Sequence, residues 1–418
     1  MSLPQPDRIV VVNDISVARG GATALALRSA LELRARGHEV TFLTGDNGGN
    51  AELEAAGIEI VGVGQERLLA SSPAKALING LYNGAAARIV DDWIARRDTP
   101  ATVYHLHGWA QILSPAIFRP LDRVADRLVL SAHDFFLSCP NGAYANLKSG
   151  VLCEFTPMSA RCVAANCDRR SYGHKLWRVA RHAVRQWAFD FGRRAPPVLA
   201  IHAAMRPHLA RGGVPESSIV TLPNPVMPFL TTRAPAEQNT GFLYVGRLET
   251  VKGADLAAAA AARAGVPLTL VGEGPLREMI ERDYPQAVCA GRLSPQEIAP
   301  LAAAARGLVM PSRYPEPYGL VAAEALWSGL PVIAADTAFL AADIVAAEAG
   351  FACAPRDTAA LAEAMRALNS DDALAGRMSR NAYERTRSIG LTLPAWVDAL
   401  EAVYQARVSS ARTPALAG

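Results

Sequence analysis

The sequence predicts an α/β protein built from two doubly wound, Rossmann-like lobes that face each other across a cleft. Short apolar runs alternate with segments of helical periodicity along the whole chain, and glycines follow many of the runs. A polar, proline-containing stretch divides this series into two halves. Strand, glycine-rich loop and helix in repeated order are typical of parallel sheets, and 418 residues are enough for two such domains.

The first half opens with a βαβ unit. Arg8–Asn13 is an apolar strand, Thr23–Arg36 has the apolar spacing of a helix, and Glu39–Leu43 is the next strand. Gly20 and Gly21 interrupt the loop before the helix. The later strands predicted in this half are Ile58–Val63, Thr102–Leu106, Arg127–Ala132, Pro196–Ala200 and Ile219–Leu222.

A second βα series follows a predicted linker. Thr231–Thr240 is polar and comes after Pro223-Asn224-Pro225, a pattern that favours a connection between domains. The strands predicted beyond it are Thr240–Val245, Leu268–Val271, Leu308–Met310 and Val332–Ala335, with another near Val288, and the helices are Ala254–Ala264 and Leu276–Arg282.

Composition excludes several classes of protein. Half of the residues are hydrophobic and 19% are charged, so extended disorder is not expected. Residues 1–226 carry 25 Lys and Arg against 19 Asp and Glu, an excess too small to indicate a nucleic-acid-binding protein. The sequence shows no signal-peptide pattern and no apolar run long enough to cross a membrane, and its six cysteines do not form a disulfide framework. We therefore expect a cytoplasmic protein with reduced thiols.

The run Pro311–Asp336 contains the most informative motif. Glu316 lies in a proline-rich loop, and Glu324 lies eight residues further on, inside a helix expected over Gly319–Ser328. A helix N-terminus behind a tight loop presents unpaired N–H groups that suit a phosphate, and carboxylates beside it could bind sugar hydroxyls. The motif therefore predicts a nucleotide-sugar site.

Two cations follow the first strand of the second half. Arg247 and Lys252 are accompanied by Gly246 and Gly253, which permit close approach of the backbone. Such a loop would neutralise a pyrophosphate. A solvated basic loop is the alternative interpretation.

Together these motifs resemble the donor half of retaining family-4 glycosyltransferases. The resemblance rests on Gly246-Arg247-Leu248, Lys252-Gly253, Gly272-Glu273-Gly274-Pro275, Gly291-Arg292-Leu293 and the Glu-x7-Glu spacing of Glu316 and Glu324. It implies a GT-B fold and transfer of a hexose, with retention of configuration, from a nucleotide diphosphate sugar to a glycan or lipid-linked acceptor, with no cofactor required for catalysis. The domains would be an acceptor-side lobe (1–226, with a cysteine-containing insertion at 139–170), a linker (227–240), a donor lobe (241–393) and a C-terminal helix (394–418) that crosses back to the first lobe.

The resemblance also implies roles for single residues. Arg247 and Lys252 would stabilise the leaving nucleotide diphosphate, and Glu316 would orient the donor sugar. Glu324 would bind the ribose, and Gly21 would offer a backbone N–H near the phosphates. Further donor contacts are expected at Gly20, Gly246, Glu273, Gly291, Arg292, Tyr318, Gly319 and Leu320.

Two histidines at strand ends of the first half are candidate substrate contacts. The family commonly places a histidine where His133 lies, which implies substrate positioning or electrophilic help at the reacting centre. A capping pair of His133 with Asp134 is the alternative. His107 is a candidate acceptor contact, and an ordinary loop histidine is an equally good interpretation.

Four cysteines fall close together in the turn-rich insertion, at Cys139, Cys153, Cys162 and Cys167. Four thiolates could bind a structural zinc ion tetrahedrally. The spacing has no CxxC pair, so free thiols are the alternative.

Residues 174–190 form a basic amphipathic helix. An apolar stripe through Leu176, Val184 and Trp187 lies opposite the cations, which include Lys175 and Arg181. Such a helix could contact an anionic membrane, in which case the acceptor would be lipid-linked and the task would be cell-envelope or exopolysaccharide synthesis. The alternative is a surface helix that packs on the first lobe.

Other functions remain to be weighed. A dinucleotide oxidoreductase would require Gly-x-Gly-x-x-Gly after the first strand, and the loop Val17–Ala22 does not have this pattern. A sugar-nucleotide epimerase of the same fold, or a binding protein without activity, stays open. Damage at Arg247, Lys252, Glu316 or Glu324 would favour the latter, and all four are intact.

Overall fold

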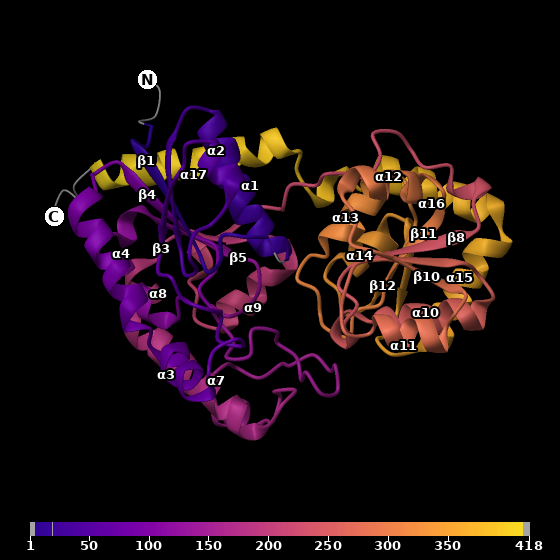
Figure 1. Ribbon diagram of the computed structural model, residues 1–418, viewed down its shortest axis with the longest axis horizontal. Helices are drawn as coiled ribbons and strands as arrows, with labels where there is room; N and C mark the ends of the chain where they lie inside the picture. The colour runs from indigo at the N-terminus through magenta and orange to yellow at the C-terminus, as the bar shows by residue number, and fades with distance from the viewer. Residues whose placement is uncertain (1–4, 19, 413–418) are drawn as a thin grey trace. The chain divides into compact units, whose positions relative to one another are not determined.

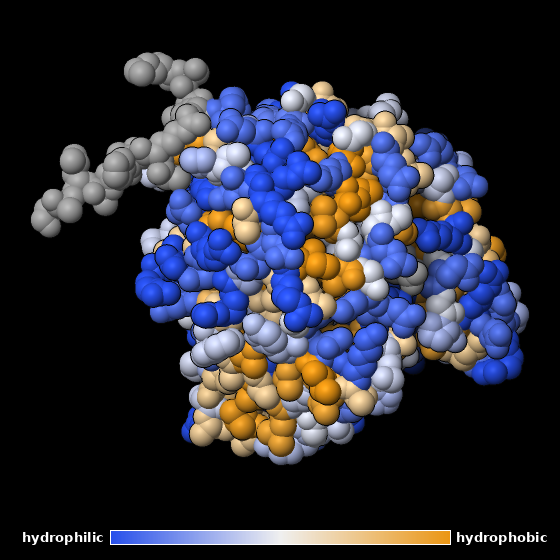
Figure 2. Space-filling model, turned by 60° about the vertical axis from the view of Figure 1, so that its left-hand side comes forward, coloured by the Kyte–Doolittle hydropathy of each residue, from blue (hydrophilic) through white to orange (hydrophobic). Residues whose placement is uncertain are grey.

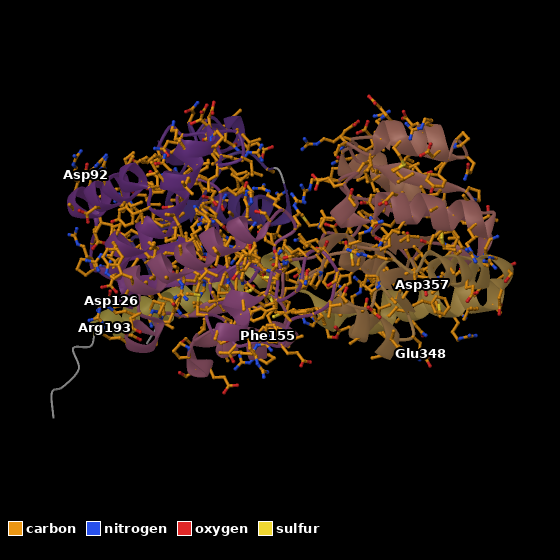
Figure 3. All side chains as sticks on the ribbon, turned by 90° about the horizontal axis from the view of Figure 1, so that it is seen from below. Asp92, Asp126, Phe155, Arg193, Glu348 and Asp357 are labelled. Atoms are coloured by element: carbon orange, nitrogen blue, oxygen red, sulfur yellow. The ribbon has the colours of Figure 1, made fainter. Side chains whose placement is uncertain are left out.

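The computed structural model describes residues 5–18 and 20–412, so Arg19 of the glycine-rich loop and the two chain ends lie outside the described residues. The chain forms two compact units (Figure 1). Of the described residues, the first comprises 5–18, 20–148, Cys153–Leu222 and 394–412, and the second Ser149–Leu152 and Pro223–Leu393. In Figure 3, Asp92, Asp126, Phe155 and Arg193 mark the first unit, and Glu348 and Asp357 mark the second.

The first unit contains a seven-stranded parallel sheet in the order β3-β2-β1-β4-β5-β6-β7. Its strands are β1 (Arg8–Asn13), β2 (Glu39–Thr44), β3 (Glu59–Gly62), β4 (Thr102–Leu106), β5 (Leu128–Ala132), β6 (Val198–Ala200) and β7 (Ile219–Thr221). Every strand predicted in this half is present, with ends that differ by one or two residues at most. The central strands β1 and β4 are buried along almost their whole length, as expected for a parallel sheet covered on both faces.

Helices cover this sheet and include a segment from the end of the chain. They are α1 (Gly21–Ala35), α2 (Ala51–Ala55), α3 (Pro73–Leu81), α4 (Gly84–Arg97), α5 (Phe118–Asp122), α6 (Ala160–Ala164), α7 (Tyr172–Ala188), α8 (Phe191–Arg194), α9 (Arg206–Arg211) and α17 (Leu393–Arg412). In Figure 1 the yellow helix α17 lies against the indigo and purple first unit. Arg36 holds it there through hydrogen bonds to Asp398 at 2.5 Å and Glu401 at 2.6 Å, and Tyr404 is buried.

Helix α1 begins at Gly21, two residues earlier than predicted. Gly20 is its N-cap, in an extended conformation and without a capping side chain. Both glycines are exposed. The start of the helix therefore presents backbone N–H groups that no side chain covers.

The second unit contains a six-stranded parallel sheet in the order β10-β9-β8-β11-β12-β13. Its strands are β8 (Gly241–Val245), β9 (Leu268–Val271), β10 (Ala287–Gly291), β11 (Ala305–Met310), β12 (Val332–Ala335) and β13 (Gly350–Cys353). Its helices are α10 (Ala254–Ala264), α11 (Arg277–Asp283), α12 (Pro295–Ala303), α13 (Leu320–Trp327), α14 (Leu340–Ala346), α15 (Thr358–Ser370) and α16 (Asp372–Arg385). The predicted bounds of α10 and β9 agree with the structure.

The core of the second unit is centred on α10. Six of its eleven residues are buried, five of them alanines, and leucines and a methionine of α15 lie in the same core cluster. Alanine side chains allow close helix packing and favour the helix itself. The chain thus has two α/β units, each with a parallel sheet, as predicted.

Candidate functional site

The strand order of the second unit reverses between β8 and β11. The strands β9 and β10 extend the sheet on one side of β8, and β12 and β13 extend it on the other side of β11. Connections that leave two neighbouring strands in opposite directions open a crevice at the carboxyl ends of those strands, where ligands of such sheets bind. The predicted cations follow β8, and the predicted acid Glu316 follows β11.

Lys252 and Glu316 meet at this point. Lys252 ends the 3-10 turn η6 (Thr250–Lys252), and its Nζ lies 2.5 Å from Oε1 of Glu316. Ser312 donates a hydrogen bond to the same oxygen at 2.9 Å. The side chain of Glu316 is only 10% exposed and that of Lys252 is 30% exposed, so the lysine remains accessible to a ligand. The sequence motif includes Ser312, four residues before Glu316 in the same loop, but sequence reasoning gave it no role.

Gly253 allows these two loops to pack together. It has a φ of +74°, and an added Cβ would lie 2.1 Å from the carbonyl oxygen of Pro311. Any side chain here would separate the loop after β8 from the loop after β11. The glycine next to the predicted lysine therefore holds Lys252 close to Glu316.

Arg247 does not join this pair. Its guanidinium donates to Glu249 Oε1 at 2.6 Å, and its side chain is 55% exposed. The pairing with Glu249 was not predicted. An exposed ion pair of this kind is weak, so Glu249 can release the arginine to a stronger anion.

Glu324 lies on α13, whose N-cap is Gly319 at a φ of +83°. Burial of the carboxyl group raises the pKa of Glu324 to about 8. Leu320 is the first residue of the helix, where N–H groups are left without helical partners. The hydroxyl of Tyr318 donates to the carbonyl oxygen of Ile389 at 2.7 Å, so this side chain is occupied within the unit.

The remaining predicted donor contacts follow β8, β9 and β10. Glu273 accepts a hydrogen bond from Arg277 at 2.7 Å, and a Cβ added to Gly291 would lie 3.1 Å from the Glu273 carboxylate. Gly246 donates its N–H to Val271 O, and Arg292 is exposed. These residues lie at the same edge of the sheet as Lys252 because they follow neighbouring parallel strands.

The first unit has its own point of reversal, between β1 and β4. Gly20 and Gly21 follow β1, His107 follows β4 and His133 follows the adjacent β5. The sequence therefore predicted correctly that these residues lie at strand ends. Their contacts with substrate remain predictions.

The structure brings the histidines of this edge together. His107 Nδ1 lies 3.0 Å from His133 Nε2, and the two rings stack at 5.3 Å. His105 in β4 contacts the Tyr404 hydroxyl at 2.7 Å and the Ser131 hydroxyl at 2.9 Å. Burial lowers the pKa of His133 to about 4 and lowers the pKa of His107 well below its usual value. Both rings are therefore neutral at physiological pH.

Asp14, which sequence reasoning missed, fixes the loop after β4. Its carboxylate accepts three backbone N–H groups, from Gln111, Ile112 and Leu113, at 2.8 to 2.9 Å. Burial raises its pKa, against these hydrogen bonds and the nearby charge of Arg181. A polar residue directly after a strand was the signal in the sequence.

The structure corrects the interpretation of α7. Its cations face inward: Lys175, Arg181 and Arg185 are buried, whereas Leu176 and Trp187 are exposed. Because these three cations are buried, they do not form a basic surface that could bind anionic lipid. Periodicity separated the two faces correctly but assigned the wrong one to the interior, because partners distant in sequence satisfy the cations. None of the described helices is both long and apolar enough to span a membrane.

The predicted zinc site is not formed. The four cysteines line one small cavity together with Lys175, but no group of three or more His, Cys, Asp or Glu side chains in the described ranges is arranged to hold a metal ion. Asn141 lies between two of the thiols: it accepts from Cys139 at 3.1 Å and donates to Cys167 at 3.2 Å. Lys175 donates to Cys162 at 3.5 Å. Hydrogen bonds thus replace the predicted metal ligation.

Comparisons with known proteins identify both units. Residues 19–228 match the family model described as Glycosyltransferase Family 4, which spans half of the chain. Residues 232–385 match the model described as Glycosyl transferases group 1.

Two curated relatives illustrate the similarity in sequence. Glycogen synthase of Mycobacterium tuberculosis is 32% identical over 278 residues, which cover 62% of this chain and 64% of the relative. O-antigen chain mannosyltransferase C of Escherichia coli is 30% identical over 179 residues, 40% of this chain and 47% of the relative. The aligned region thus spans less than two thirds of the length of either relative.

Solved structures show the same fold over almost the whole chain. Sucrose-phosphate synthase from Thermosynechococcus elongatus has a TM-score of 0.68 at 20% identity, covering 96% of this chain and 98% of that one. Anabaena Alr3699/HepE in complex with UDP has a TM-score of 0.64 at 16% identity, with coverages of 96% and 100%. WaaG, a glycosyltransferase involved in lipopolysaccharide biosynthesis, has a TM-score of 0.63 at 18% identity, with coverages of 95% and 99%. The predicted GT-B fold is confirmed.

Proposed function

The chain belongs to glycosyltransferase family 4, and on this premise we propose that it transfers a hexose from a nucleotide diphosphate sugar to a glycan or lipid-linked acceptor. The transfer retains the anomeric configuration and requires no catalytic metal ion. The first unit carries the acceptor side and the second unit binds the donor. The relative named O-antigen chain mannosyltransferase C supports assembly of a cell-envelope or exopolysaccharide glycan, and the relative named glycogen synthase supports a glycan acceptor.

The observation that carries this proposal is the Lys252–Glu316 pair at the point of strand reversal. An accessible ammonium group beside a buried carboxylate is an arrangement that can be exchanged for a ligand. A diphosphate would attract Lys252, and Glu316 would then accept hydrogen bonds from the hydroxyls of the donor sugar. Arg247 would leave Glu249 for the same diphosphate.

Catalysis in this proposal is electrostatic. When the glycosidic bond to the diphosphate breaks, negative charge develops on the departing phosphate oxygens. Lys252 and Arg247 stabilise that charge, together with the N–H groups at the start of α13, beginning with Leu320, which follow the loop that carries Glu316. His133 positions the reacting sugar, and Gly21 offers a backbone N–H near it.

Other donor contacts are made mainly through the backbone. Gly291 and Arg292 line the nucleotide base, Gly246 lets the backbone approach the diphosphate, and Glu273 holds the loop beside Gly291. Glu324 accepts hydrogen bonds from the ribose hydroxyls. Tyr318 acts indirectly, because its hydroxyl is bound to Ile389 O and its backbone leads into Gly319.

A transfer assay tests the proposal. Purified protein is incubated with UDP-, GDP- and ADP-hexoses and with saccharide or lipid-linked acceptors, and release of the nucleoside diphosphate is measured. We expect the protein to turn over one of these donors. The anomeric configuration of the product, measured by NMR, should be the same as that of the donor. A chelator should leave the rate unchanged. Inversion of the anomeric centre, or a product that is an isomerised nucleotide sugar, would contradict the proposal.

Donor binding is expected to release a proton. The raised pKa of Glu324, about 8, keeps this carboxyl protonated at neutral pH, whereas ribose hydroxyls stabilise the ionised form. Affinity should therefore rise with pH by up to about tenfold per unit below that pKa and level off above it. Calorimetry in buffers of different ionisation enthalpy measures the released proton. The variant Glu324→Gln should bind without this dependence, and buffer-independent heats in the unaltered protein would contradict the role of Glu324.

Six exposed apolar side chains on and beside α3 and α7 support a lipid-linked acceptor. They form the α3–α7 patch: Leu69, Leu77, Ile78, Tyr82, Leu176 and Trp187. The two helices pack side by side, and Figure 2 shows orange side chains gathered at the lower end of the first unit, where they lie. Phe155, labelled in Figure 3, is another exposed apolar side chain, in the nearby insertion. Arg119 lies 5.0 Å from the Trp187 ring and supplies positive charge at the border.

We expect this patch to bind the surface of an anionic membrane, which would place the protein at the inner face of the cell membrane. The variants Ile78→Asp and Trp187→Asp each change a side chain that is about 64% exposed. Each should weaken co-sedimentation with anionic vesicles by roughly tenfold, because it removes a large apolar contact with the membrane. Val288→Asp, at an apolar site of the second unit that is 59% exposed, is the matched control. Unchanged co-sedimentation of both patch variants would remove the membrane role.

A further inference from the structure

His107 and His133 form a buried pair at the carboxyl edge of the first sheet. Their contact joins Nδ1 of His107 to Nε2 of His133 at 3.0 Å, with the ring planes 20° apart. The proposed function uses His133 and leaves His107 without a task. His107 is 5% exposed, too little for direct contact with a bulky acceptor.

When two neutral imidazoles form one hydrogen bond, one of the two bonded nitrogens carries a proton and the other accepts it. Here the bonded nitrogens are Nδ1 of His107 and Nε2 of His133. Each ring then has one nitrogen left over: Nε2 of His107 and Nδ1 of His133. Both atoms are buried, and within the described part of the chain neither has a hydrogen-bond partner. The proton that His107 gives or takes at Nδ1 therefore decides whether Nδ1 of His133 is a donor or an acceptor.

His107 is itself held firmly in place. Its backbone N–H donates to Val12 O at 2.9 Å, and its ring packs against His105 at 4.0 Å between centroids. His105 is fixed at both ring nitrogens, by Tyr404 of α17 and by Ser131 of β5. A rigid support of this kind can set the orientation of the next ring.

We infer that His107 is a positioning residue: through its Nδ1 it fixes the ring orientation and tautomer of His133, the ring that the proposed function places at the reacting sugar. The inference rests on the proposed function, in which His133 contacts the reacting sugar. It gives the buried contact between the two rings a task, because the proton at His107 Nδ1 sets which nitrogen of His133 carries its own proton. It also replaces the predicted acceptor contact of His107 with an indirect role.

Two amide variants separate positioning from packing. Asparagine carries a polar atom at the place of Nδ1, whereas glutamine carries one at the place of Nε2. His107→Gln should lower kcat by about 10- to 100-fold with little change in the donor KM, because a misdirected His133 affects the reacting geometry rather than ground-state binding. His107→Asn should restore most of the rate. His174→Gln, an exposed histidine of the same unit, is the control.

The state of His133 supplies a readout that does not depend on turnover. In protein labelled with nitrogen-15 at histidine, the ring nitrogens of His133 should report one tautomer in the unaltered chain and in His107→Asn, and a mixture in His107→Gln. Melting temperatures establish that all variants are folded. If His107→Gln is fully active, or if Asn and Gln lower kcat equally, or if the His133 shifts do not respond, the inference is wrong. If the unaltered protein turns over no nucleotide sugar, the proposed function fails instead, and the nitrogen shifts still test the pairing.

Discussion

Lys252→Ala is expected to lower the turnover of the donor by roughly 10²- to 10³-fold, the usual effect of removing one group that stabilises developing charge. Lys252 Nζ is accessible, lies at the strand reversal of the donor-binding unit and is paired with a carboxylate that has its own task in the proposal. Loss of the ammonium removes stabilisation of the departing diphosphate. Because this interaction is strongest in the transition state, kcat should fall more than the donor KM rises.

Two controls separate this effect from damage to the fold. Arg263→Ala removes one exposed positive charge from α10 in the same unit, and its turnover should be unchanged. Removing Lys252 also leaves the Glu316 carboxylate, among the described residues, with the hydrogen bond from Ser312, so the melting temperature of the variant must be measured beside its rate. A folded Lys252→Ala protein with undiminished turnover would show that the lysine does not act on the leaving group.

Arg306→Met is expected to destabilise the second unit by about 3 kcal/mol or more. Arg306 is 1% exposed, yet it contacts the carbonyl oxygens of Leu368, Glu237 and Asn239 at 2.7 to 3.1 Å and Asp372 at 2.7 Å. Methionine fills similar space but donates nothing, so several carbonyl groups lose their partner. Urea denaturation followed by hydrogen exchange in peptides of this unit measures the change.

A variant of Asp372 separates the effect of the ion pair with Arg306 from the effect of the carbonyl contacts. Asp372 is 77% exposed, so the ion pair is screened by water and Asp372→Asn should cost less than about 1 kcal/mol. A large effect of Asp372→Asn, together with a small effect of Arg306→Met, would mean that the ion pair rather than the carbonyl contacts stabilises this region.

The strands of this fold were predictable because a parallel strand buried on both faces is a short apolar run. Thr102–Leu106 and Leu268–Val271 are such runs, and their bounds agree with β4 and β9. The start of α1 was placed too late, since Gly21 lacks the apolar signal that marks a helix. Glycine can still begin a helix when the residues after it continue it.

The orientation of α7 could not be predicted from periodicity. Its pattern defines two faces, and the apolar face normally turns inward. Here the interior supplies partners for the cations: Arg181 lies near Asp14 and Asp134, and Lys175 lies among thiols. These partners are distant in sequence, so their proximity is a property of the fold.

The site shows the same division. Lys252 and Glu316 could be grouped because both belong to the motifs that resemble the donor half of family-4 glycosyltransferases, whereas the pairing of their strands, β8 and β11, is a finding of the structure. The local pair of Arg247 with Glu249 and the distant pair of His105 with Tyr404, 299 residues apart, could not. The spacing of the cysteines also could not predict that Asn141 forms hydrogen bonds with both Cys139 and Cys167.

The central claim is that the edge of the second unit around Lys252 binds the diphosphate of a nucleotide sugar. Thermal unfolding with UDP-, GDP- and ADP-sugars tests it most directly, because a ligand at a hundred times its Kd stabilises the folded state by about 2.7 kcal/mol. We predict that the sugar nucleotides of one base raise the melting temperature, and that the free nucleoside diphosphate of that base does so too. The variant Lys252→Ala should lose most of this shift. Shifts with none of these nucleotides, or shifts of equal size in Lys252→Ala, would contradict the account.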